Sequence, residues 1–220
     1  MGKTGKNAKA VGIIGGSDGP TSIFVAGRGK KRLKQRIYKY KFETRRKYYA
    51  SRIKPHSHEM KEVIAYIKEK YGFDELAKDT REYKGEYDNL RASFIMHYQP
   101  ELLGEYSKLP ELLNHDEEGV RVFQEQLRIR EQKAKEISED IFSIDYHILK
   151  RTEKDCNMHI NIETRFGYIG GGYSGLGRST KRIFDKIYKD VYLYYGVTEE
   201  DIANKTSRYK SLLTTLAMRN

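Results

Sequence analysis

The sequence predicts an α+β protein that is predominantly helical, with a long central helix, a helical bundle and a small β element. Two observations support this prediction. Apolar residues recur at three- and four-residue intervals over much of residues 57–151 and 180–216, which is the period of amphipathic helices. Two short segments, an N-terminal hairpin near 10–27 and a strand near 158–166, instead alternate with the period of strands. With 220 residues, the chain is long enough to bury one sizeable core.

The N-terminal segment, residues 11–27, reads VGIIGGSDGPTSIFVAG. Two short apolar runs flank Gly, Asp and Pro, which predicts a β-hairpin. We expect this hairpin to join the strand near 158–166. The chain is then predicted to have two parts: a hairpin and basic helix arm, 1–54, and a mainly helical body, 55–220, with a strand and Gly-rich loop at 158–178.

Helices are predicted along most of the remaining chain. The segment 28–51 is a basic helix with a narrow apolar stripe of Leu33, Ile37 and Tyr40. A helix capped by Ser57 ends at Gly72, and a more polar one runs from 74 towards 98. Short helical turns follow Pro100 and Pro110, where a new helix can begin.

The strongest periodic signal covers residues 116–151. Its apolar positions are Val120, Phe123, Leu127, Ala134, Ile137, Ile141, Ile144 and Ile148. Only Arg130 departs from the pattern, so the segment predicts one helix of more than thirty residues. This helix either packs on its neighbours or forms a homodimer through residues 116–151 as a coiled coil.

The C-terminal third begins with a strand, since Met158, Ile160 and Ile162 alternate with polar residues. A Gly-rich loop at 170–177 leads to a helix capped by Ser179. A final helix starts at Thr198, which precedes three acidic residues.

Positive charge is concentrated in the predicted arm. The formal net charge is +11; residues 1–54 contain 16 Lys and Arg against 2 Asp and Glu, which is +14, and the remainder contains 26 against 29, which is −3. A basic arm beside a nearly neutral body is typical of proteins that bind polyanions. A solubilising surface would spread its charge more evenly, and a membrane-surface protein would need an apolar helix face.

Two further features bear on location. No run approaches the roughly 20 apolar residues that span a bilayer, so we expect no membrane partner. The single cysteine, Cys156, excludes an internal disulfide framework. We therefore expect a cytoplasmic protein.

Aromatic residues are interleaved with cations in the basic segment, and this combination favours binding to nucleic acid, RNA rather than DNA, or to a ribonucleoprotein. Tyr173 lies in the Gly-rich loop and is flanked by Arg165 and Arg178, and we expect these side chains to contact bases or the nucleic-acid backbone. The candidate nucleic-acid-binding residues are Arg28, Lys30, Lys31, Arg32, Lys34, Arg36, Lys39, Lys41, Arg45, Arg46, Lys47, Arg165, Tyr173 and Arg178.

Metal and catalytic signals are sparse. Cys156 and His159 form half of a zinc pattern with no second pair, so we expect neither metal nor cofactor. The polar positions of the 158–166 strand are His159, Asn161, Glu163 and Arg165. Either Asp18 or the strand face with His159 and Glu163 would serve the alternative of a metal-dependent nuclease acting on RNA or DNA. We expect a binding protein rather than an enzyme.

The stretch GIIGGSDGPTSIFVA resembles a signature of the membrane-embedded β subunit of sodium-translocating carboxylate decarboxylases. The motif loop comprises Gly15, Gly16, Ser17, Asp18, Gly19 and Pro20, followed by Thr21. In that family the aspartate serves sodium transport within the membrane. The hydrophobic helices that surround the motif there are missing from this sequence, so the resemblance does not imply ion pumping here.

The overall layout, a small basic protein with this N-terminal element, is similar to that of mobile-element anti-CRISPR proteins that inhibit Cas9. This resemblance implies binding to the complex of Cas9 with its guide RNA, through contacts between basic residues and RNA phosphates. The leading prediction is therefore a nucleic-acid- or ribonucleoprotein-binding protein. The nuclease and a dimeric helical scaffold are the alternatives.

Overall fold

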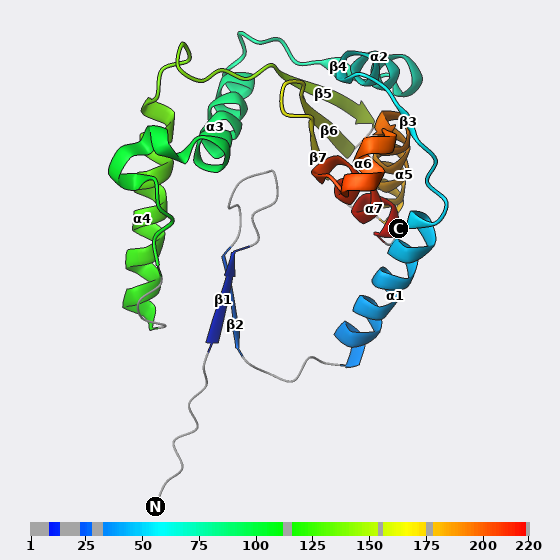
Figure 1. Cartoon of the computed structure of the whole chain (residues 1–220). Coiled ribbons are helices and arrows are strands. Elements are labelled where there is room, and N and C mark those ends of the chain that lie inside the picture. Colours follow the sequence, from blue (N-terminus) through cyan, green and yellow to red (C-terminus); the bar gives the residue numbers. More distant parts are fainter. Residues whose placement is uncertain are drawn as a thin grey trace, which may run out of the picture. The chain divides into compact units, whose positions relative to one another are not determined.

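The computed structural model describes residues 9–13, 23–27, 33–111, 116–153, 156–174 and 178–218 (Figure 1). These residues form seven α-helices, one 3-10 helix and eight strands, which confirms the predominantly helical α+β class. The chain divides into two compact units. The first contains residues 1–30 and 78–144, and the second contains residues 31–77 and 145–220. These boundaries differ from the one predicted at residue 54.

The predicted N-terminal hairpin is present. β1 (Lys9–Ile13) and β2 (Ile23–Gly27) pair antiparallel, with Val11 opposite Val25. They form a two-stranded sheet of their own. The expected junction with the strand near 158–166 is not formed, because that strand has other neighbours on both of its edges.

The main sheet belongs to the second unit and has the antiparallel order β4-β5-β6-β7. Its strands are β4 (Asp74–Glu75), β5 (Tyr146–Glu153), β6 (Cys156–Glu163) and β7 (Tyr168–Ser174). The alternation predicted for β6 is confirmed, since Met158, Ile160 and Ile162 are all buried in the core.

Two helices, α2 (Met60–Tyr71) and α5 (Arg178–Tyr195), pack in the same core, to which Tyr209, Leu212, Leu213 and Leu216 near the C-terminus also belong. Val63 and Ile67 of α2 are fully buried, and each such side chain stabilises the fold by about 1.5–3 kcal/mol. The helix ends at Gly72 as predicted, with this glycine in the left-handed conformation that terminates helices.

Two predicted caps are placed differently. The cap of α2 is Glu59, which forms a capping box with Glu62, and not Ser57. Ser57 lies instead in β3 (His56–Ser57), which pairs with β8 (Gly196–Val197). Ser179 falls inside α5, which already begins at Arg178.

The predicted final helix is two helices. α6 (Glu199–Asn204) has the predicted Thr198 cap, and Lys205 then adopts a positive φ of 49° that ends the helix. α7 (Ser207–Ala217) begins after a second cap, Thr206. The basic helix α1 (Leu33–Ala50) contacts α7, so it packs within the second unit.

The first unit contains α3 (Arg81–Tyr98), η1 (Pro100–Tyr106) and α4 (Glu117–Glu136). α3 begins seven residues later than predicted because Asp74 and Glu75 form β4, and its cap is Thr80. α3, η1 and α4 are in mutual contact, and both α3 and α4 contribute buried residues to this unit.

The prediction of a single helix across 116–151 is wrong beyond Glu136. Residues 146–153 form β5, in which Tyr146 and Leu149 are almost fully buried. The isoleucine spacing fits a helix, but pairing with β4 and β6 hydrogen-bonds this backbone and buries its apolar side chains at the same time. A coiled-coil dimer through the whole of 116–151 loses its basis.

The prediction of a Gly-rich loop at 170–177 is wrong for its first part, because Gly170, Gly171 and Gly172 lie in β7. A Cβ at Gly171 would lie 2.6 Å from the carbonyl oxygen of His159 and 3.4 Å from the Phe184 ring. A Cβ at Gly172 would lie 2.8 Å from the His159 ring. The glycines therefore permit close packing of β7 against β6 and α5.

We predict that Gly171→Ala lowers the free energy of unfolding by about 1–3 kcal/mol, the usual cost of overpacking, because backbone atoms must move. Gly85, inside α3, is the control, since an added Cβ there meets nothing within 4 Å. Gly85→Ala should stabilise by about 0.5–1 kcal/mol. Chemical denaturation measures both effects, and stabilisation by Gly171→Ala would contradict the strand assignment.

Candidate nucleic-acid interface

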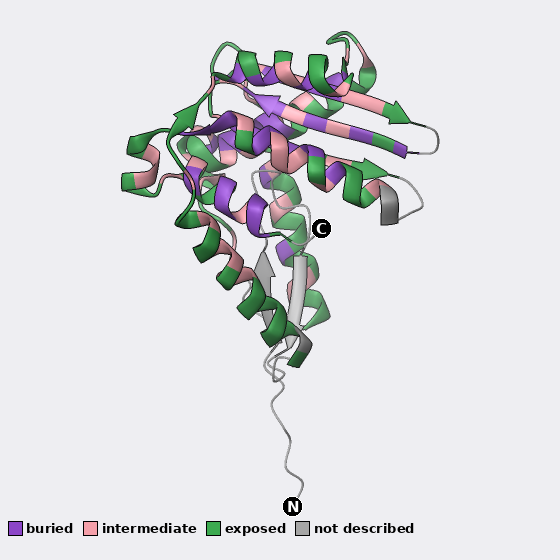
Figure 2. Cartoon of the chain, turned by 90° about the vertical axis from the view of Figure 1, so that its right-hand side faces the viewer, coloured by how far each residue is buried: buried purple, intermediate pink, exposed green. Residues whose placement is uncertain are grey.

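Most of the predicted binding residues lie on α1. Its described cations are Arg36, Lys39, Lys41, Arg45, Arg46 and Lys47. No described side chain of this helix is fully buried (Figure 2). Tyr49 and, after the helix, Ile53 pack against the core of the second unit, so the C-terminal half of α1 anchors it.

The narrow apolar stripe predicted for α1 is exposed. Leu33 is 71% exposed, Ile37 45% and Tyr40 73%. Tyr38 is exposed as well. Unburied rings among cations are the combination that binds single-stranded nucleic acid, by stacking on bases and pairing with phosphates.

The cations of α1 have no carboxylate partner within salt-bridge distance among the described residues. The helix contains a single acidic residue, Glu43, and none in its first turn. Arg36 therefore adds to the positive end of the helix dipole, where cations are unfavourable. No ion pair among the described residues neutralises the positive charge of this helix.

The cations of α4 are arranged in the opposite way. Within this helix Arg121 pairs with Glu118, Arg128 with Glu125, Lys133 with Glu136 and Lys135 with Glu131. Each pair is three or four residues apart, the spacing at which helical side chains meet. α4 has five acidic and five basic residues, so most of its cations are paired within the helix, unlike those of α1.

α5 contributes a second row of cations that the sequence reasoning missed. Arg182, Lys186 and Lys189 follow the i, i+4, i+7 spacing of one helix face. The opposite face buries Phe184, Ile187 and Val191 in the core. The signal was present in the sequence, but only the buried face was used to predict this helix.

The cations of α1 and α5 are close enough to affect each other. Burial lowers the pKa of Lys189; Asp185 opposes this shift, whereas Arg45 on α1 and Lys181 on α5 lower the pKa further. The ammonium of Lys189 also donates to the carbonyl of Met218, at 2.7 Å. Because like charges from two helices repel here, α1 and α5 contribute to one positive surface, which we call the α1–α5 surface.

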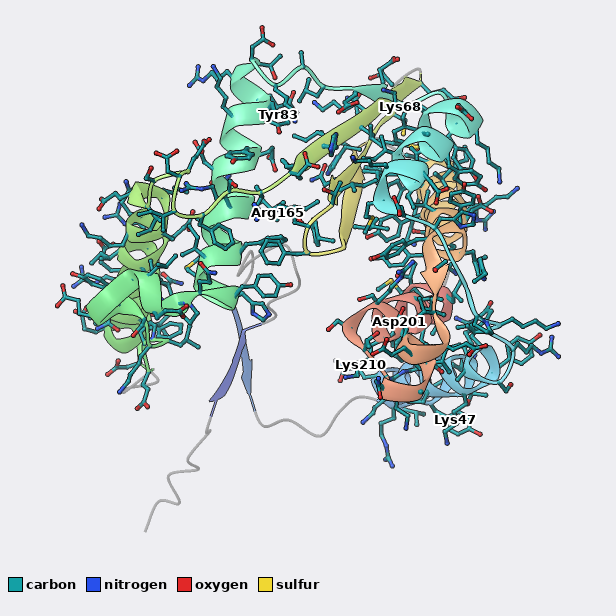
Figure 3. All side chains as sticks on the ribbon, turned by 45° about the horizontal axis from the view of Figure 1, so that its top comes forward. Lys47, Lys68, Tyr83, Arg165, Asp201 and Lys210 are labelled. Carbon is teal, nitrogen blue, oxygen red and sulfur yellow. The ribbon has the colours of Figure 1, made fainter. Side chains whose placement is uncertain are left out.

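The remaining described candidates divide between two places. Tyr173, near the end of β7, has its ring 5.3 Å from Phe184 of α5, and it is close enough to Lys181 of the same helix to help raise the pKa of that lysine. Arg165 lies in the turn before β7, about 17 Å or more away along the strand. Figure 3 shows Arg165 well apart from Lys47 on α1. The predicted grouping of Arg165 with Tyr173 is therefore not formed.

Several predicted residues lie outside the described part of the chain. These are Arg28, Lys30, Lys31 and Arg32, the motif loop Gly15, Gly16, Ser17, Asp18, Gly19 and Pro20, and the side chains of Lys34 and Arg178.

The half zinc pattern does not form a metal site. Cys156 and His159 are three residues apart on β6, so they lie on opposite faces of the sheet. Cys156 is buried in the core, while the His159 ring covers Gly172. Within the described ranges no group of three or more His, Cys, Asp or Glu side chains is placed to hold a metal ion.

Glu163 lies on the strand face that the alternative nuclease would use, but its role in the structure is to hold a turn. This carboxylate is fully buried. It accepts hydrogen bonds from the backbone N–H groups of Asp145, at 2.9 Å, and Phe166, at 2.6 Å. Glu163 therefore holds the turn between β6 and β7 and is not accessible to a substrate.

We predict that Arg45→Gln raises the pKa of Lys189, because the substitution removes a neighbouring like charge. Lys47→Gln is the control from the same helix and should leave this pKa unchanged. NMR titration of labelled lysine side chains measures both. An unchanged Lys189 pKa in Arg45→Gln would contradict the proximity of α1 and α5.

Comparisons with protein-family models, curated proteins and solved structures find no match to this chain. Of the helices that the structure describes, none is both long and apolar enough to cross a membrane. The function is therefore inferred from the residues and geometry of the α1–α5 surface.

Proposed function

We propose that the chain binds nucleic acid through the α1–α5 surface, without catalysing a reaction on it. The observation that carries this proposal is the absence of described carboxylate partners for the cations of α1, in contrast to the paired cations of α4. Unpaired cations on one surface repel each other. A polyanion relieves this repulsion, and its binding is favoured by the release of condensed counterions.

The charge of the two compact units supports the same surface. Residues 31–77 and 145–220 contain 27 Lys and Arg against 15 Asp and Glu, a net charge of +12. Residues 78–144 of the first unit contain 10 against 15, a net charge of −5, and residues 1–30 add 5 against 1, so the first unit as a whole has a net charge of −1. A polyanion is therefore attracted to the second unit and repelled by the α3–α4 part of the first.

The exposed rings favour single-stranded RNA over a DNA duplex. Tyr38, Tyr40 and Tyr173 are all more than one-third exposed. Bases can stack on such rings only when they are unpaired, which is the usual state of the RNA segments that proteins recognise. The exposed RNA of a ribonucleoprotein, such as Cas9 with its guide RNA, offers the same chemistry and is a second target.

We predict that replacing Lys39, Lys41 and Lys47 together by Gln weakens binding to a short single-stranded RNA. Each lost phosphate contact should reduce the slope of log K against log salt by about 0.7, so the triple variant should lose a slope of about 2. Fluorescence anisotropy over about 50 to 200 mM salt measures this change.

The matched control replaces Arg121, Arg128 and Lys133 of α4 by Gln, which removes the same charge from paired positions. This variant should bind as the parent chain does. Equal weakening by both variants would show that only net charge matters.

Failure to bind RNA, DNA and the Cas9–guide RNA complex would overturn the proposal, and RNA cleavage in Mg²⁺ or Mn²⁺ would favour the nuclease instead.

A further inference from the structure

A cavity of about 400 Å³ lies in the first unit, between η1 and α4. Tyr106, Leu109, Pro110 and Ile129 form much of its lining, together with the side chain of Arg130. Leu109 and Ile129 are both exposed to solvent. The cavity is thus largely apolar and open, and its lining contains two cations, the exposed Lys108 and the buried Arg130.

Arg130 is only 8% exposed. Its Nε donates to the carbonyl of Tyr106 at 2.9 Å, and its Nη2 donates to the carbonyls of Met96 at 3.2 Å and Ser107 at 3.1 Å. These carbonyls lie at the C-terminal ends of α3 and η1, where helices leave acceptors unpaired. Nη1 has no hydrogen-bond partner among the described residues, so two N–H groups remain to bind a ligand.

The charge of Arg130 is not balanced by a carboxylate within salt-bridge distance among the residues that the structure describes. Burial lowers the pKa of its guanidinium, as expected for a cation removed from water. Carbonyl dipoles at helix ends compensate only part of a full charge. Glu105 and Glu111 also line the cavity, but both are exposed and hence screened by water.

Arg91 of α3 provides a comparison within the same unit. It is also buried, and its guanidinium donates to the carbonyls of Phe142, at 2.7 Å, and Ile137. Arg91 does not line the cavity. Hydrogen bonding to main-chain carbonyls therefore accounts for the burial of both arginines. It does not account for the position of Arg130 in the lining of an apolar cavity.

We propose that this cavity binds a small apolar carboxylate. The carboxylate accepts hydrogen bonds from Nη1 of Arg130 and supplies the missing negative charge, and the apolar part contacts Leu109, Pro110 and Ile129. The volume is at the lower end of the range of about 300–1,000 Å³ for small-molecule sites, which favours a compact acid. This site is separate from the α1–α5 surface and does not depend on the binding of nucleic acid.

The test uses hydrocinnamate as the probe and its neutral amide, hydrocinnamamide, as the matched compound, with the full chain and isothermal titration calorimetry. Hydrocinnamate should bind at least about tenfold more tightly, since a charge-assisted hydrogen bond is stronger than a neutral one. Ile129→Glu should abolish hydrocinnamate binding, because it places in the cavity lining a negative charge that repels the carboxylate of the ligand. Equal affinity for acid and amide, or binding of neither, would overturn the proposal.

Val122→Glu is the control, because Val122 is on the same helix, is 45% exposed and does not line the cavity. It should leave hydrocinnamate binding unchanged, and equal loss in both variants would overturn the site. NMR of the unmodified chain gives a second readout: the Arg130 Nε–H signal should shift on titration, and a shift confined to other residues would contradict the proposal. RNA binding should persist in Ile129→Glu, so the two proposals can fail separately.

Discussion

The packing of α2 and α5 on one face of the four-stranded sheet is the constraint on which the rest of the second unit depends. Alternate residues of β6 meet Phe184, Ile187 and Val191 in a single core, and Gly171 leaves room for Phe184 to approach β7. Once this face of α5 is buried, the face with Arg182 and Lys186 must lie outside. The positive α1–α5 surface is therefore a consequence of hydrophobic packing elsewhere on the same helix.

The ion pairs of α1 and α4 follow the compositions of the two helices, because α1 has a single acidic residue whereas α4 has five acidic and five basic residues. Exposed pairs such as Arg121 with Glu118 contribute little stability, because water and salt screen them. Their main effect in α4 is to neutralise the helix surface. α1 has only Glu43 for this purpose, so its positive potential extends into solvent, where it attracts phosphates and weakens as salt increases.

Buried arginines organise the first unit. Arg91 connects α3 to the carbonyls that follow α4, and Arg130 connects α4 to the ends of α3 and η1. Each guanidinium presents several fixed donors, and so one side chain can satisfy carbonyls from different segments. Arg130 is the residue that interrupts the apolar pattern of α4, and it lies on the buried face because its hydrogen bonds compensate for the loss of water.

Features encoded within a few residues were predictable from the sequence: α2 and its end at Gly72, the Thr198 cap, the alternation of β6, the hairpin and the cations of α1. Periodicity and capping are local, so they can be recognised without a partner. β5, the strand character of Gly170–Gly172, the end of α4 and the proximity of α1 to α5 were not predictable in this way. The sequence by itself determined that α1 has a large excess of positive charge, since Glu43 is the single acidic residue among its many cations. Only the tertiary structure decided which surface shares that charge, because strand pairing and helix packing join residues that lie far apart in the chain.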